Sequence, residues 1–173
     1  MILQEAAVWI DGLFPGEISI EKSGDFHLAS FEADGQFIVS TLDFQRVDTG
    51  LESDGQRIAV ELFAVAEVEE GLKELVLATA EMLRDTGITP QPGEVVPGSG
   101  AVVPGISTKH SLLVVPFPWG GDVPHFKEEG SMTLMLQILP LTDAELEYLA
   151  TYGLADLQKA LVEQQVNVFD LNR

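Results

Sequence analysis

The stretch MTLMLQILPLTDAELEYL, residues 132–149, carries the clearest structural signals in the sequence. Its first half, Met132 to Leu139, is a nearly continuous apolar run of strand length, which is typical of a strand buried on both faces of a sheet. Thr142 follows it, and Glu145 stands three residues further on, a spacing that predicts a capping box at the start of a helix. The sequence therefore predicts a central strand that leads directly into a helix.

Three other segments have the apolar spacing of helices. Gly153 ends the predicted helix, and the leucines of residues 154–161 predict a second one directly after it. Apolar residues recur at helical spacing over residues 2–13, so the chain is expected to open with an amphipathic helix. Residues 68–83 show the same period, and Gly87 lies just past their end, where a left-handed cap is easiest for glycine.

The remaining regular elements are predicted strands. Phe26–Glu32 and Phe37–Val47 flank Asp34-Gly35, which supplies the positive φ angles of a tight turn, so we expect a hairpin. Arg57–Ala66 is apolar on both faces and belongs in the interior of a sheet covered by helices. Ser111–Pro116 is a short apolar strand.

Two segments rich in proline and glycine, Pro90–Gly105 and Pro116–Gly130, are predicted to be ordered loops. No internal repeat or change of composition divides the chain. The predicted fold class is therefore α+β: a single domain over residues 1–173, with a mostly antiparallel central sheet flanked by helices.

The charge is extreme, because 9 Lys and Arg stand against 28 Asp and Glu and the formal net charge is -19. Such a field repels nucleic-acid phosphates and anionic lipid, so neither nucleic acid nor membrane is expected as a direct partner. The acidity fits solubility or a salty cytoplasm, a basic protein partner, or imitation of nucleic-acid charge. With no cysteine and no basic start to a signal peptide, a cytoplasmic location is expected.

The sequence contains few groups that suggest catalysis. His110, Asp122 and His125 could in principle form a metal or acid–base site, although their spacing matches no known ligand motif. Arg57 and Glu61 share one face of a strand and could form an ion pair or contact a neighbouring backbone. Fingerprints of nucleotide-binding loops and nucleophile elbows are absent. We therefore expect no catalytic residues, no metal and no cofactor.

The best candidate for a binding surface is the second loop. It combines large apolar groups with acidic ones on a Gly/Pro-rich backbone, as an interface anchor requires. The alternative is that Phe117 and Trp119 fold back and seal the sheet. The predicted partner-binding residues are Phe117, Trp119, Asp122, His125 and Phe126.

Several motifs together resemble the suppressor-of-fused family. The C-terminal signature is LMLQILPLTDAELEY (residues 134–148), then YGL (152–154) and a tail with Asp170 and Arg173. RIAVEL (57–62) resembles the Arg…Glu-Leu strand of the family. Pro92-Gly93 and KHSLL (109–113) resemble the segment that precedes its next strand.

The resemblance implies a binding function, since bacterial members are stand-alone domains and many are thought to be immunity proteins that neutralise toxins. The animal protein adds a second lobe that clasps its partner peptide, so its clamp residues are not carried over. We predict a non-catalytic protein-binding domain, and the resemblance favours a role as an immunity protein that neutralises a basic toxin. The alternatives are an enzyme that uses His110, Asp122 and His125, or a homo-oligomeric scaffold subunit of unknown oligomeric state.

Overall fold

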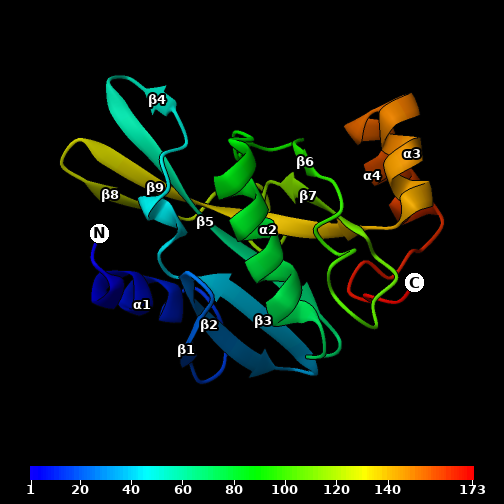
Figure 1. Cartoon of the computed structure of the whole chain (residues 1–173), viewed down its shortest axis with the longest axis horizontal. Coiled ribbons are helices and arrows are strands. Elements are labelled where there is room, and N and C mark those ends of the chain that lie inside the picture. The colour runs from blue at the N-terminus through cyan, green and yellow to red at the C-terminus, as the bar shows by residue number, and fades with distance from the viewer.

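The sheet is built outward from its two longest strands, β5 (Gln56–Ala66) and β9 (Ser131–Leu141), which run parallel side by side at its centre. The computed structural model describes all of residues 1–173 (Figure 1). The strand order is β1-β2-β3-β5-β9-β7-β6, with β4 added to β5 and β8 added to β9. All other pairings are antiparallel, so the predicted α+β fold with a mostly antiparallel sheet is confirmed.

The other strands are shorter. The remaining strands are β1 (Ser19–Ser23), β2 (Phe26–Ala33), β3 (Gln36–Thr41), β4 (Leu51–Ser53), β6 (Val95–Val96), β7 (His110–Val114) and β8 (His125–Glu128). The helices are α1 (Leu3–Asp11), the 3-10 turn η1 (Phe44–Arg46), α2 (Leu72–Thr86), α3 (Asp143–Tyr152) and α4 (Leu154–Glu163). None of these helices combines the length and the apolar character needed to cross a bilayer.

Helices cover both faces of the sheet, as the apolar character of β5 and β9 requires. Helix α2 lies across one face (Figure 1) and packs on a core that alternate residues of β5 and β9, such as Leu62 and Ile138, contribute. The opposite face carries α1 over Phe63 and Met135. Further along that face, α3 and α4 pack over Leu139 and its neighbours.

Most predicted elements are confirmed. Asp34 and Gly35 adopt φ angles of 53° and 75° in the β2–β3 hairpin, and Gly87 caps α2 with φ 68°. Thr142 accepts a hydrogen bond from the Glu145 N–H, and the Glu145 carboxylate accepts one from the Thr142 N–H, which completes the capping box.

Three sequence predictions were wrong in extent. The strand predicted over Phe37–Val47 stops at Thr41, because the chain then turns into η1 and its backbone N–H groups bond to a side chain. The loop predicted over Pro116–Gly130 contains β8, whose alternating exposed and half-buried residues form a hairpin with β9. The two-residue strand β6 lies within the first predicted loop. Strands β1 and β4 were not predicted, because these short edge segments are polar or exposed.

Glu61 on β5 anchors η1 to the sheet. Its carboxyl group is fully buried, and it accepts hydrogen bonds from the Thr41 hydroxyl and from the backbone N–H groups of Phe44 at 3.2 Å and Gln45 at 3.0 Å. Burial raises the pKa of Glu61 to about 7, although these hydrogen bonds favour the ionised form and act in the opposite direction. Arg57 makes no ion pair with Glu61 but donates to the carbonyls of Gln45 and Val47, so the predicted contact to a neighbouring backbone is confirmed.

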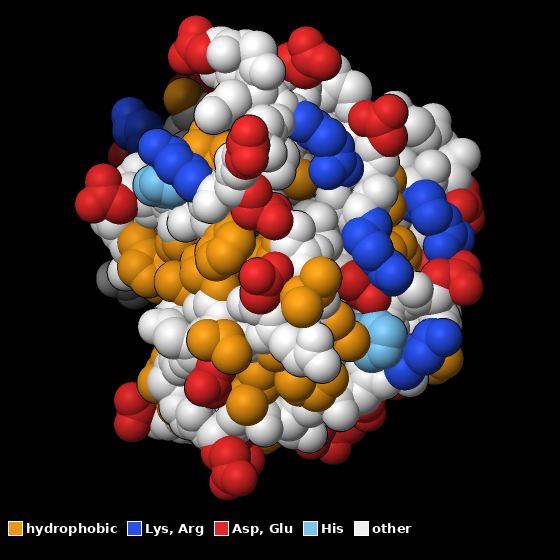
Figure 2. Space-filling view, turned by 90° about the vertical axis from the view of Figure 1, so that its left-hand side faces the viewer, with side chains coloured by type: hydrophobic (Ala, Val, Ile, Leu, Met, Phe, Trp, Pro, Cys, Tyr) orange, Lys and Arg blue, Asp and Glu red, His pale blue; other side chains and the backbone are white.

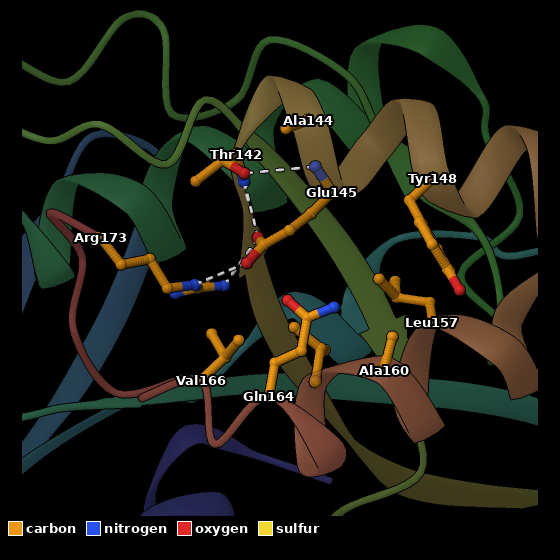
Figure 3. A pocket seen from close by; sticks show the side chains of 10 residues that line it. Thr142, Ala144, Glu145, Tyr148, Leu157, Ala160, Gln164, Val166 and Arg173 are labelled. Carbon is orange, nitrogen blue, oxygen red and sulfur yellow. Dashed lines mark hydrogen bonds and ion pairs between the residues drawn. The ribbon is translucent and has the colours of Figure 1, made fainter.

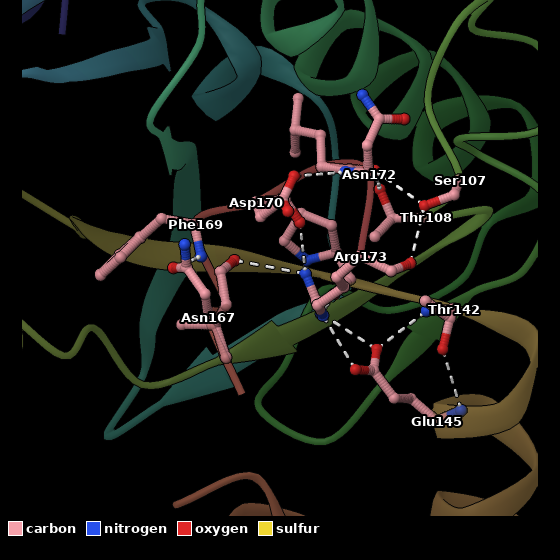
Figure 4. A network of polar contacts seen from close by, with 12 residues as sticks. Ser107, Thr108, Thr142, Glu145, Asn167, Phe169, Asp170, Asn172 and Arg173 are labelled. Atoms are coloured by element: carbon pink, nitrogen blue, oxygen red, sulfur yellow. Dashed lines mark hydrogen bonds and ion pairs between the residues drawn. The ribbon is translucent and has the colours of Figure 1, made fainter. Parts of the chain in front are cut away.

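Arg173 holds the C-terminal tail against α3 and β9 (Figure 4). Its guanidinium donates to the Glu145 carboxylate at 2.8 and 3.0 Å and to the Pro140 carbonyl. Both side chains are largely buried, with exposed fractions of 10% and 15%. Helix α3 has no fully buried residue of its own. Its position therefore depends strongly on this ion pair and on the capping box.

The raised pKa of Glu61 predicts a pH dependence of stability. The folded protein keeps the Glu61 proton up to about pH 7, whereas the unfolded chain loses it near pH 4.5. The contribution of Glu61 to the free energy of unfolding therefore falls as the pH rises through this window, by up to about 3 kcal/mol. Urea unfolding of the wild type and E61Q between pH 4.5 and 8 measures it, because the amide does not titrate. Parallel pH profiles for the two proteins would contradict the assignment.

The largely buried ion pair of Arg173 predicts a second effect. R173M leaves the Glu145 carboxylate without its partner and should lower the free energy of unfolding by about 2–3 kcal/mol. The matched control is K159M, which removes the exposed pair between Lys159 and Glu163 on α4 and should change stability little. Hydrogen exchange should become faster in α3 of R173M first. Equal stability losses in the two variants would rule out a special role for Arg173.

Candidate functional site

The loop between β7 and β8 crosses the face of the sheet that also carries α1 and the α3–α4 pair. Its first part is fixed by a hydrogen bond from the Phe117 N–H to the Gln137 side-chain oxygen at 2.8 Å. Its last part is fixed by the Met135 N–H, which donates to the Pro124 carbonyl at 3.0 Å. The loop is therefore attached to β9 at two points and lies between α1 and α4.

Trp119 in this loop joins the core only in part. Its ring lies 5.6 Å from the rings of both Phe14 and Phe63, measured between centroids, and packs edge-on against Phe63. It nevertheless stays half-buried rather than fully enclosed. Trp119 therefore folds back onto the sheet through its contacts with Phe14 and Phe63, as the alternative prediction expected, while part of its ring stays exposed.

The exposed part of Trp119 lines a hollow of about 650 Å³ between α1 and the loop. Gly120 and Gly121, with φ angles of 60° and 100°, form a turn that brings Asp122 back to the same hollow. Figure 2 looks onto this side of the molecule, where hydrophobic side chains gather in a hollowed band with acidic side chains along it. The lining residues are Trp9, Leu13, Trp119, Asp122, Val123, Pro124 and His125.

The five predicted partner-binding residues are divided between two places. Trp119, Asp122 and His125 line the hollow beside α1, and Phe126 packs against Trp9 with ring centroids 5.9 Å apart. Phe117 is 43% exposed and lies on the other side of the loop. There it lines a separate apolar hollow of about 340 Å³ with residues of α4. Sequence reasoning missed Trp9, because nothing in the sequence indicates that α1 lies next to this loop.

A third hollow, of about 590 Å³, lies between α3, α4 and the C-terminal tail (Figure 3). Tyr148, Leu157 and Leu161 contribute to its apolar lining. Its two charged residues, Glu145 and Arg173, are already paired with each other. Its charged groups therefore serve the fold.

His110 lies far from His125, although Asp122 and His125 line the same hollow. His110 on β7 pairs with Leu141 of β9, whereas His125 on β8 pairs with Leu134, seven residues away. At about 3.3 Å per residue this separation is roughly 23 Å. His110, Asp122 and His125 therefore do not form one metal or acid–base site, and no other group of three His, Asp or Glu residues could hold a metal ion.

His110 instead has a structural role. Its Nδ1 accepts a hydrogen bond from the Gly98 N–H at 3.0 Å, so the proton lies on Nε2, which contacts Asp143 at 2.7 Å. His27 likewise contacts Asp43, whose carboxylate also accepts from Arg46 at 2.6 Å. These contacts join loops to neighbouring elements, so His110 and His27 serve the fold.

The chain is similar to known proteins in sequence and in fold. It is 25% identical over 136 residues to Immunity protein YqcF of Bacillus subtilis (strain 168), a match that covers 78% of this chain and 71% of that protein. A crystal structure of a SUFU homologue from Neisseria gonorrhoeae FA 1090 has a TM-score of 0.67 at 18% identity, covering 98% of this chain and 93% of that one. A chain of the Sufu–Fu complex has a TM-score of 0.68 at 12% identity, covering 92% and 83%.

The two solved structures show that the fold is shared. The family model of Suppressor of fused protein (SUFU) matches residues 23–173, which extends the resemblance upstream of Arg57 to include β2 and β3. The match covers most of the sheet and every helix except α1. The chain therefore belongs to the suppressor of fused (SUFU) family.

Proposed function

We propose that this chain is a non-catalytic protein-binding domain that acts in the cytoplasm as an immunity protein against a basic toxin. The observation that carries the proposal is the likeness to Immunity protein YqcF over 78% of the chain. A chain of the same fold has been solved in the Sufu–Fu complex, in keeping with a role in binding. The separation of His110 from Asp122 and His125 removes the strongest catalytic candidate and favours binding over catalysis.

The charge of the chain supports a basic partner. The formal net charge is -19, and five of the nine Lys and Arg side chains already form ion pairs with acids of the chain itself. Most of the acidic side chains are therefore not neutralised within the chain, and they contribute to the negative electrostatic field around it. A field of this sign steers a basic protein toward productive encounter and repels competing acidic proteins.

The loop from Phe117 to Phe126 is the proposed contact surface. It lies between two hollows, it carries exposed Phe117 and half-buried Trp119, and it is attached to β9 at both ends. A surface that is already ordered loses little conformational freedom on binding. Aromatic anchors beside acidic groups suit a basic partner with some apolar surface.

A test of the proposed function is co-expression with a toxin encoded beside the gene for this chain. Cells that make the toxin alone should stop growing, and cells that make both proteins should grow. The two purified proteins should form a stable complex in size-exclusion chromatography. Growth arrest that persists with both proteins present, together with no complex, would refute the proposal.

The charge makes a kinetic prediction for the same complex. The association rate constant should fall by roughly tenfold or more between 50 and 500 mM NaCl, because salt screens long-range steering. The dissociation rate constant should change much less. Stopped-flow or surface plasmon resonance at several salt concentrations measures both constants. An association rate that does not depend on salt would show that the acidity does not direct the encounter.

A further inference from the structure

The hollow beside α1 contains both tryptophans of the chain. Trp9 projects into it from α1 and Trp119 from the β7–β8 loop, so two indole rings from distant parts of the sequence border one space. The volume of about 650 Å³ is within the range of ligand pockets in proteins. Neither ring is fully enclosed, and each therefore offers part of its surface to a bound group.

Both indoles are held in place from behind. Trp119 rests on Phe14 and Phe63, which are buried in the core. Trp9 packs against Phe126 of β8, with the rings tilted by 52°. Aromatic side chains fixed in this way present a flat, negatively polarised face without losing rotamer freedom on binding.

An unpaired carboxylate completes the hollow. Asp122 is exposed and its side chain makes no ion pair or hydrogen bond within the chain, unlike Asp43 or Asp143. A backbone hydrogen bond from the Asp122 N–H to the Trp119 carbonyl, at 3.0 Å, fixes it beside the indole. No Lys or Arg lines the hollow. His125 lines it too, and its Nδ1 donates to the Val123 carbonyl at 3.1 Å.

We propose that this hollow binds an arginine side chain of a basic partner protein. The guanidinium stacks on an indole face and donates hydrogen bonds to Asp122. Arginine suits this site better than lysine, because its planar, weakly hydrated head group both stacks on aromatic rings and pairs with a carboxylate through two parallel donors. The proposal that the arginine belongs to a toxin rests on the proposed function.

The hollow beside α4 lacks this combination. Phe117, Leu139 and Val162 are typical of its lining, and none of its residues is acidic. A cation placed there would lose hydration without gaining a charged partner. The difference between the two hollows provides an internal control for the experiment.

The test uses the full chain and two probes of equal charge, hexa-arginine and hexa-lysine, at 0.15 M NaCl. Because both tryptophans line the hollow, fluorescence excited selectively at tryptophan reports on this site. Hexa-arginine should change the emission and bind roughly fivefold more tightly than hexa-lysine. D122N should weaken hexa-arginine binding by roughly fivefold, and W9L should weaken it by a similar factor.

Two variants outside the hollow serve as controls. E147Q removes one exposed charge from α3, and V162A alters the hollow beside α4, so both should bind hexa-arginine like the wild type. Asp122 lies on an exposed turn, so D122N tests the site even if W9L folds poorly. Equal binding of the two probes, or equal losses in D122N and E147Q, would reduce the effect to general charge attraction and overturn the proposal.

The toxin assay separates this proposal from the proposed function. If D122N and W9L bind a neutralised toxin as tightly as the wild type, the arginine hollow is not its docking site, while the immunity function stands. If no toxin is neutralised but hexa-arginine binds with the predicted selectivity, the hollow stands as an arginine site and the immunity function fails.

Discussion

The structure depends on the parallel contact between β5 and β9 at the centre of the sheet. Seven consecutive residue pairs, from Arg57 with Ser131 to Phe63 with Gln137, form this contact. A parallel pair is usually buried on both faces, and here helices cover both sides of the two strands. Because 67 residues lie between the paired segments 57–63 and 131–137, this one pairing joins the N-terminal meander to the C-terminal helices.

Successive parts of β9 contact different neighbouring elements. Its first residues pair with β8, and its last ones pair with β7 on the same edge. Between these two partners, Met135 and Gln137 hold the two ends of the connecting loop. The strand then runs into the capping box of α3, where Arg173 contacts Pro140 and Glu145. One strand therefore positions the loop, the helices and the tail.

The fold divides the carboxylates into those with hydrogen-bond donors within the chain and those that remain exposed without a partner. Glu61, Glu145 and Asp43 are held by donors within the fold, and each stabilises a particular junction. Asp122 is left without a partner, beside two half-buried indoles. The net charge of the chain is -19, but paired carboxylates contribute little to the electrostatic field that a partner meets. The positions of the unpaired carboxylates therefore determine where a basic partner is attracted.

Local signals in the sequence determined the main elements and the family. The capping box, the Asp34-Gly35 turn and the Gly87 cap depend on neighbours a few residues apart, so they could be predicted from spacing alone. The short edge strands could not, because a strand such as β8 is defined by its partner rather than by its own propensity. The apolar pattern of the C-terminal segment was sufficient to suggest the SUFU family.

Only the tertiary structure decided how the candidate residues are grouped. His110 and His125 are close in sequence, but β7 and β8 pair with opposite ends of β9 and keep them apart. Trp9 and Trp119 are distant in sequence, yet α1 and the β7–β8 loop bring them to one hollow. The physical reason is that side-chain proximity in a sheet follows register and layer packing, which connect segments irrespective of their separation along the chain.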